Sequence, residues 1–220
     1  MKRTLIVALS LATAASFAPA VSAASREPVK NCTKATARPH AAPSVAQPKT
    51  IAKSLPTTFT FFTNCGNIVV ETVGAKAPQT LTALATLASK GFYTSTLCHR
   101  LTTQGLYVLQ CGDPTASASG GPVFNRKAWT GIPDENLPVD QEMTYPAGTV
   151  AMANSGKNTN GSQFFLVFGD SPALGPSYTI WGKITKGLDV LKFIASKGVD
   201  NPSGIGKPNI KVAIESAIVR

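Results

Sequence analysis

The polar side chains best suited to chemistry fall in two stretches of the chain. Cys98-His-Arg100 ends a short β-like run with a guanidinium, and Gln163-Phe-Phe165 lies beside the amide-rich stretch Asn154–Asn160. Arginine and amide side chains can pair with a peptide backbone, while neighbouring apolar residues can accept an apolar side chain. The pattern favours a peptide-binding site whose chemistry makes and breaks no covalent bond.

Patterns typical of covalent, metal and cofactor chemistry are absent from the sequence. Gly161-Ser-Gln163 is not the GxSxG motif of serine hydrolases, and His99 is the one histidine after residue 56. No CxxC spacing, phosphate-binding loop or dinucleotide fingerprint occurs. The ten acidic residues after residue 56 show no spacing that singles out a catalytic pair. We therefore expect neither a metal nor a cofactor.

Short strands and two helices must position these residues. Strand-like runs are expected at 57–63, 68–73, 97–100, 107–110, 149–153, 163–168, 179–185 and 210–219. One helix is predicted from Pro78 to about Lys90, and a shorter one over 188–196. Many short strands with few helices predict an antiparallel barrel or sandwich.

The first 56 residues differ in composition from the rest. Residues 1–23 read as a secretory signal with a basic start, an apolar stretch and the small residues Val21-Ser-Ala23 at the expected cleavage site. Residues 24–56, the arm, are rich in Ala, Pro, Lys, Thr and Ser without an apolar period, which predicts a flexible tether. Residues 57–220 are expected to form the folded domain. The chain is thus predicted to be exported, to the periplasm, the cell envelope or the medium.

The formal net charge of +10 is unevenly distributed. The signal contributes +2, the arm +5 and residues 57–220 only +3. Interleaved aromatic and basic residues, as on a nucleic-acid platform, are absent, so nucleic acid is not an expected partner. The basic arm could make a weak contact with an anionic surface, although a solvated spacer is an equally good interpretation.

Cysteines occur at positions 32, 65, 98 and 111. An even number in an exported chain indicates two disulfides, for which three pairings are possible. Cys98 and Cys111 flank a predicted hairpin and could face each other across neighbouring strands, which would leave Cys32 to join the arm to Cys65.

Four segments of the chain form an ordered set of motifs: Cys98-His-Arg-Leu, Val108-Leu-Gln-Cys-Gly-Asp113, Met152-Ala-Asn-Ser-Gly-Lys-Asn-Thr-Asn-Gly-Ser-Gln-Phe-Phe165 and Trp181-Gly-Lys183. Together they resemble the signature segments of the cyclophilins, a family of peptidyl-prolyl cis–trans isomerases. The resemblance runs in order over Thr57 to Arg220. It implies an eight-stranded antiparallel closed β-barrel capped by two α-helices, with the site in a groove on the outside of the barrel.

The resemblance also implies roles for individual residues. Arg100 matches the catalytic arginine, which would donate a hydrogen bond toward the prolyl nitrogen and favour the twisted state of the bond. Gln110, Asn154 and Gln163 match positions that bind the substrate backbone, with a main-chain contact from Ala153. The proline pocket would be walled by Tyr107, Val108, Phe165 and Leu174, and Tyr178 stands where the family often has histidine.

Simpler interpretations exist for three of these residues. Arg100 could be an ordinary surface arginine, and Phe165 and Leu174 could belong to the core. His99 alternates with Cys98 and Arg100 along the strand and is interpreted as structural.

The sequence departs from the family pattern at a few positions. Tyr107 stands where phenylalanine is usual and Val108 where methionine is common. Two extra residues are expected between Arg100 and Gln110, near Thr102–Gly105. Ala173 occupies the position of a tryptophan that contacts cyclosporin in many members. Weakened cyclosporin binding is therefore expected, and nanomolar inhibition of the pure protein would refute it.

The leading hypothesis is an exported, monomeric isomerase that acts on proline-containing peptides and on unfolded or folding exported proteins. The alternative is a proline-peptide binding or chaperone module at the cell envelope in which catalysis is incidental. Under the first hypothesis biological activity falls with isomerisation when Arg100 is changed to alanine, and under the second it survives.

Overall fold

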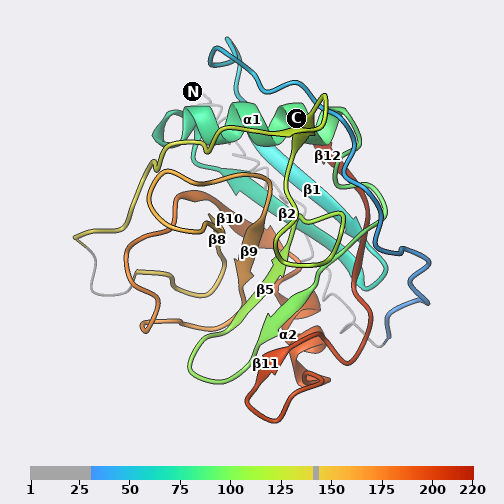
Figure 1. Cartoon of the computed structure of the whole chain (residues 1–220). Coiled ribbons are helices and arrows are strands. Elements are labelled where there is room, and N and C mark those ends of the chain that lie inside the picture. The colour runs from blue at the N-terminus through green and yellow to red at the C-terminus, as the bar shows by residue number, and fades with distance from the viewer. Residues whose placement is uncertain (1–30, 141–143) are drawn as a thin grey trace, which may run out of the picture.

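A curled antiparallel sheet dominates the computed structural model, which describes residues 31–140 and 144–220 (Figure 1). The ten strands follow the order β11-β4-β5-β9-β8-β10-β2-β1-β12-β3. Their bounds are β1 Thr58–Thr63, β2 Gly66–Thr72, β3 Thr96–Leu97, β4 Arg100–Thr102, β5 Val108–Cys111, β8 Thr149–Met152, β9 Phe164–Val167, β10 Ile180–Lys186, β11 Ile205–Gly206 and β12 Ala213–Val219. A separate hairpin pairs β6, Val123–Phe124, with β7, Lys127–Ala128.

Because the sheet is curled, strand β3 at one end of the strand order lies next to strand β4 near the other end, and the two are consecutive in the chain. Strand β3 pairs with β12 at one end of the order, and β4 pairs with β5 near the other. Between them, the Cys98 N–H donates to Val212 O at 2.9 Å and the His99 N–H donates to Gln110 O at 3.1 Å. The mainly β class with two helices is confirmed, in the form of a half-barrel with ten strands in place of the eight expected.

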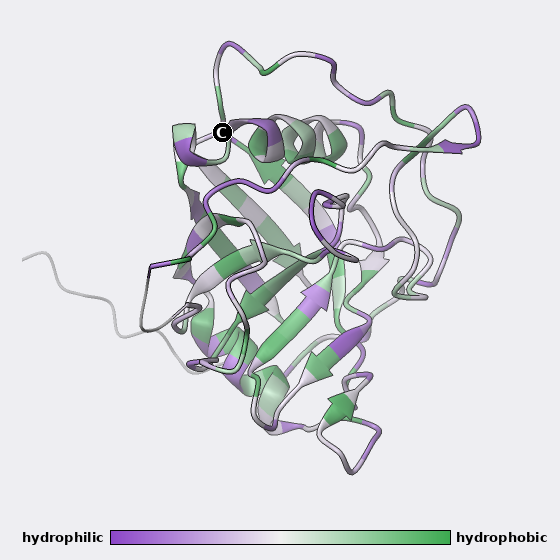
Figure 2. Cartoon of the chain, turned by 60° about the vertical axis from the view of Figure 1, so that its left-hand side comes forward, coloured by the Kyte–Doolittle hydropathy of each residue, from purple (hydrophilic) through white to green (hydrophobic). Residues whose placement is uncertain are grey.

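Aromatic side chains fill the inside of the curled sheet. The rings of Phe61 and Phe164 stack at 4.9 Å, and Phe59 meets Trp181 edge-on at 5.3 Å. Phe59 and Phe61 alternate with less buried residues along β1, as a strand with one buried face requires. Figure 2 shows the same division, with hydrophobic residues concentrated on the strands and helices.

Two α-helices lie at opposite ends of the sheet (Figure 1). Helix α1, Pro78–Ser89, follows the short 3-10 turn η1, Gly74–Lys76, and begins at the proline as predicted. Its first free N–H groups, on Gln79 and Thr80, donate to the Glu135 carboxylate at 3.0 and 2.9 Å. Helix α2, Leu188–Ser196, buries Val190, Leu191 and Ile194.

The arm is where the structure differs most from the sequence prediction. Residues 31–56 contain no helix or extended strand, yet they follow the surface of the domain in place of forming a free tether (Figure 1). Thr33 N–H donates to Asn64 O at 2.8 Å, Ala52 N–H donates to Thr82 Oγ1 at 3.0 Å, and Val45 is only 3% exposed. A few anchoring residues therefore order a segment that has no hydrophobic period. The predicted signal, 1–23, lies outside the described residues.

Both disulfides pair as predicted, Cys32 with Cys65 and Cys98 with Cys111, which confirms that part of the prediction. Within residues 31–140 and 144–220, no His, Cys, Asp and Glu side chains cluster in a way that could hold a metal ion. No helix in the same ranges has the length and apolar character needed to span a membrane.

Candidate functional site

A groove on the outer face of the sheet gathers most of the predicted site residues. It is a cavity of about 160 Å³ lined by Arg100, Thr102, Leu106, Val108, Gln110, Ala153, Asn154, Phe165, Leu174 and Tyr178. Eight of the ten residues singled out in the sequence lie there, and Gln163 and Tyr107 do not line it.

The pairing of β4, β5 and β9 explains how residues far apart in sequence meet on this face. Arg100 stands opposite Gln110, and Gln110 stands opposite Phe165 on the next strand. Because side chains alternate along a strand, the residues between them face the other way, and Leu101 and Leu109 are fully buried in the main core. The sheet therefore presents one guanidinium, one amide and one phenyl ring in a row.

The groove has an apolar wall that is separate from the main core. Phe165 packs with Val108, Ala151 and Val167 in a cluster of its own, and Leu174 lies against that cluster. The Tyr178 ring meets Phe165 edge-on at 5.4 Å. Phe165 is only 5% exposed, but it is buried in this groove-side cluster and not in the main core inside the sheet.

Tyr145 supports this wall and was missed in the sequence, where no motif distinguishes it. Its hydroxyl donates to Tyr178 O at 3.1 Å and accepts from Tyr178 N at 2.9 Å. Burial raises the pKa of Tyr145 to about 12, so the hydroxyl stays protonated and can donate at neutral pH. Tyr145 thereby fixes the backbone that carries Tyr178.

The amide of Gln163 is occupied by neighbouring protein groups. Its Oε1 accepts a hydrogen bond from Gln110 Nε2 at 2.8 Å, and its Nε2 donates to Ala118 O at 3.0 Å and Gly120 O at 2.8 Å. The Gln163 side chain therefore bridges Gln110 and the backbone of residues 118–120, and its contact with a substrate backbone stays a prediction from the sequence.

Asn154 is similarly engaged through its side chain. Its Nδ2 donates to Ser177 O at 2.9 Å, and its Oδ1 accepts from the Gly156 N–H at 3.2 Å. These bonds join the loop after β8 to the loop that carries Tyr178. The Ala153 N–H donates to Gln163 O at 2.9 Å, so the Ala153 carbonyl and the Asn154 peptide group form the groove edge available to a ligand backbone.

The loop after β5 is organised around one buried carboxylate. Asp113 accepts from the N–H groups of Thr115, Ser117 and Gly120 at 2.8, 3.0 and 3.1 Å. Burial alone would raise the pKa of Asp113, but the hydrogen bonds from Thr115 and Gly120 and the nearby His99 outweigh it and lower that pKa. A Cβ at Gly120 would overlap the carboxylate, so only glycine fits there.

This loop forms one side of a second hollow next to the groove. The hollow has a volume of about 210 Å³ and shares Gln110, Ala153 and Asn154 with the groove. Residues 118–121 and Gln163 complete part of its lining. A bound chain could therefore extend from the apolar groove into a polar neighbouring space.

Tyr107, expected in the wall of the proline pocket, does not line this cavity in the structure. Leu106 and Thr102 line the groove, whereas Tyr107 packs against Phe168 with ring centroids 5.9 Å apart, and its N–H donates to Ser171 Oγ at 3.0 Å. Leu106 shares the face of Val108 because they are two residues apart, and Tyr107 alternates to the opposite face.

Arg100 is exposed at the groove, whereas its neighbour His99 is buried. Neither ring nitrogen of His99 has a hydrogen-bond partner within the described structure. Burial lowers the pKa of His99, partly opposed by the charge of Asp113, so the imidazole is neutral. These placements agree with a structural role for His99 and leave the Arg100 guanidinium free to meet a ligand.

Comparison with known proteins identifies related sequences and folds. A family model described as cyclophilin type peptidyl-prolyl cis-trans isomerase/CLD matches residues 58–219. The probable peptidyl-prolyl cis-trans isomerase B of Mycobacterium leprae is 43% identical over 183 residues, which is 81% of this chain and 60% of the relative. Its Mycobacterium tuberculosis counterpart is 44% identical over 162 residues, which is 71% of this chain and 52% of that protein. The chain thus spans between half and three fifths of these relatives.

Solved structures show the same fold. A cyclophilin type peptidyl-prolyl cis-trans isomerase of Cryptosporidium parvum superposes with a TM-score of 0.63 at 26% identity, covering 75% of this chain and 98% of the other. The same protein crystallised in the presence of the dipeptide Ala-Pro gives a TM-score of 0.62 at 25% identity, covering 74% and 98%.

Proposed function

The chain belongs to the cyclophilin-type peptidyl-prolyl cis–trans isomerase family, and from this premise we propose that it accelerates rotation about X–Pro bonds in exported proteins. The observation that carries the proposal is the single groove in which Arg100, Gln110 and Phe165 meet from three paired strands.

The chemistry to be catalysed is a rotation and needs no nucleophile. Resonance gives the peptide bond partial double-bond character and a rotation barrier of about 18–20 kcal/mol. Twisting the bond localises the lone pair on the prolyl nitrogen, which then becomes a hydrogen-bond acceptor. A donor placed at that nitrogen binds the twisted state better than either planar isomer and so lowers the barrier.

Arg100 has the properties of that donor. It is exposed at the groove, and it faces Gln110 across the β4–β5 pair. A guanidinium stays charged at all working pH values and presents its donors in a fixed planar arrangement. No proton has to be transferred, which agrees with the absence of a general base among the groove residues.

The apolar wall would bind the proline ring. A hydrophobic pocket is formed by Val108, Phe165, Leu106 and Leu174, while the Ala153 carbonyl and the Asn154 peptide group can pair with the substrate backbone. The Ala-Pro named for the Cryptosporidium parvum structure is a small ligand of this class and supports proline-containing peptides as substrates.

Export is part of the proposal and rests on residues 1–23, whose pattern is that of a signal removed after Ala23. Two disulfides are consistent with an oxidising compartment. N-terminal sequencing of the secreted protein should begin at Ala24. A chain that keeps Met1 in the cell would argue against export.

The decisive experiment is an isomerisation assay on the full chain and on Arg100→Ala. We expect kcat/KM to fall roughly 100- to 1,000-fold, the loss typical of removing one preorganised donor, with Arg100→Lys between the two. Arg38→Ala, which removes an exposed arginine outside the groove, is the matched control. Equal rates for the chain and Arg100→Ala would overturn the role of Arg100, and a chain no faster than buffer would overturn the function itself.

A further inference from the structure

Part of the arm runs along the outer side of the loop that forms the second hollow. We call residues 40–47 the strap. The His40 N–H donates to Pro114 O at 2.9 Å, and the Val45 N–H donates to Val123 O at 2.8 Å. Ser44 and Val123 form a parallel β-bridge between the two segments. The strap therefore pairs with the loop at its start and near its middle.

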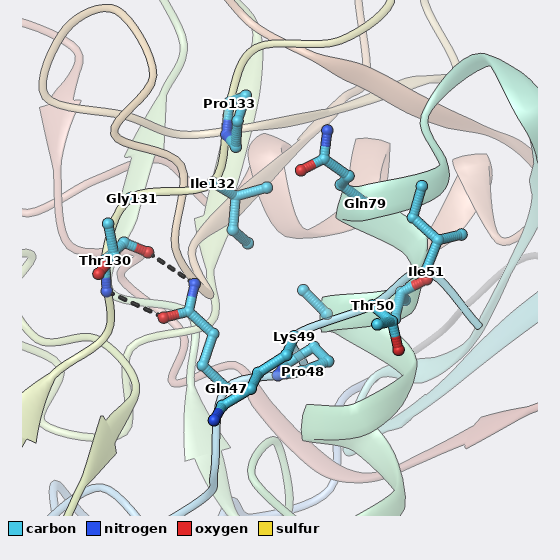
Figure 3. Close-up of a pocket in the computed structure, with 12 residues that line it drawn as sticks. Gln47, Pro48, Lys49, Thr50, Ile51, Gln79, Thr130, Gly131, Ile132 and Pro133 are labelled. Atoms are coloured by element: carbon cyan, nitrogen blue, oxygen red, sulfur yellow. Dashed lines mark hydrogen bonds between the residues drawn. The ribbon is translucent and has the colours of Figure 1, made fainter.

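Two side chains extend this pairing toward the end of the loop. Gln47 Nε2 donates to Thr130 O at 2.8 Å, and its Oε1 accepts from the Thr130 N–H at 3.0 Å, so both ends of the amide are used (Figure 3). Trp129 Nε1 donates to Val45 O at 2.7 Å. The Asn125 N–H also donates to Ser44 Oγ at 3.2 Å, so the strap is bonded to the loop at five residues between Pro114 and Thr130.

The strap itself is fixed to the domain on both sides. The disulfide from Cys32 to Cys65 precedes it, and the bond from Ala52 N–H to Thr82 Oγ1 on helix α1 follows it. Burial of Val45 anchors its centre. A segment fixed in this way can resist movement of the loop against it.

From within, the loop is held by the Asp113 carboxylate, which accepts from the N–H groups of Thr115, Ser117 and Gly120, and it has little apolar packing to add to these bonds. Residues 115–121 are Thr-Ala-Ser-Ala-Ser-Gly-Gly, which lack any large apolar side chain, and Ala116 and Ala118 adopt left-handed φ values of 51° and 67°. Because such residues make few packing contacts, the conformation of this loop depends chiefly on its hydrogen bonds.

On its inner side the same loop meets the groove. Ala118 O and Gly120 O accept from Gln163, and Gln163 in turn accepts from Gln110. Residues 118–121 line the second hollow. A continuous set of contacts therefore runs from the strap through the loop to the amide that stands beside Arg100.

We propose that the strap is a positioning element of the substrate site and sets affinity for peptides long enough to enter the second hollow. The strap lies outside residues 58–219, the segment that matches the family model, so it is an addition to the family's domain. The inference rests on the proposed isomerase function for its kinetic consequence, but the ordering of the loop can be measured without any activity.

The test uses the full chain with Gln47→Ala, which removes both bonds to Thr130, and Gln79→Ala as the matched control. Gln79 lines the same pocket as Gln47, but its exposed side chain makes no hydrogen bond in the described structure (Figure 3). We expect KM for an extended proline peptide to rise about fivefold in Gln47→Ala, the effect of losing about one net hydrogen bond, with kcat unchanged. KM for a short peptide confined to the groove should not change.

Amide hydrogen exchange provides the second measurement. Exchange at Ser119, Gly120 and Gly121 should accelerate in Gln47→Ala and not in Gln79→Ala, while exchange in β9 stays the same. Unchanged loop exchange in Gln47→Ala would overturn the inference even if the chain proves to have no isomerase activity. In an active chain, equal KM values for the extended peptide, or a rise that is the same for both peptide lengths, would also overturn it.

Discussion

At the scale of single residues, the contrast between His99 and Arg100 shows how adjacent positions on one strand take opposite environments. Arg100 faces the groove, while His99 is 7% exposed and has no hydrogen-bond partner on either ring nitrogen in the described structure. The charged groups that act on the imidazole are Asp113, which favours its protonation, and Arg100, which opposes it. Burial is the larger influence, and it keeps His99 neutral.

The neutral state of His99 predicts a loss of stability in mild acid. The folded-state pKa lies below the unfolded value of about 6.5, so the unfolded chain takes up this proton first as pH falls. Stability is complete above about pH 6.5 and declines toward the lower folded pKa, by at most about 1.4 kcal/mol per pH unit. The Asp113 carboxyl, whose pKa is also lowered, loses its contribution only below about pH 4.

Urea unfolding at several values from pH 7 to pH 5 measures this effect. The slope attributed to His99 should disappear in His99→Gln and remain in His40→Gln, which replaces an exposed histidine of the strap. NMR titration of the His99 ring in the unchanged chain gives an independent reading if the variant folds poorly. A midpoint for His99 at or above 6.5 would contradict the prediction.

At the scale of elements, strand alternation decides which site residues could be predicted. Arg100, Gln110 and Phe165 were placed in one site through their match to the cyclophilin motifs, and the pairing of β4, β5 and β9 puts them on neighbouring strands. Leu106, and not Tyr107, lines the groove beside Val108, as alternation back from Val108 indicates and the motif match alone does not.

Elements held by hydrogen bonds and not by hydrophobic burial were the ones the sequence did not reveal. The β6–β7 hairpin is short and largely exposed, and the strap has only Val45 as a buried apolar residue over its length. Neither produces a period that can be recognised, and the partners of Gln47 and Gln163 are backbone groups far away in sequence. Such contacts become visible only when the loops are placed in space.

At the scale of the whole molecule, the two disulfides tie different parts of the fold. Cys32 and Cys65 are 33 residues apart and join the arm to the β1–β2 turn. Cys98 and Cys111 are 13 residues apart and join the strand run of Arg100 to that of Gln110. The first therefore bears on the stability of the chain as a whole, and the second lies behind the face of β4 and β5 that lines the groove.

This division predicts that the two disulfides can be separated experimentally. By loop closure, removing Cys32–Cys65 should cost about 4 kcal/mol of unfolding free energy and removing Cys98–Cys111 about 3 kcal/mol.

The loss of isomerase activity should instead be larger when Cys98–Cys111 is removed, because Cys98 is two residues from Arg100 and Cys111 adjoins Gln110. With a short peptide substrate, Cys98→Ser with Cys111→Ser should lower kcat several-fold, whereas Cys32→Ser with Cys65→Ser should leave it unchanged below the melting temperature. Denaturant unfolding and the isomerisation assay measure both. Each pair serves as the control for the other, and equal loss of kcat in the two double variants would mean that the disulfide behind the groove has no specific part in positioning Arg100.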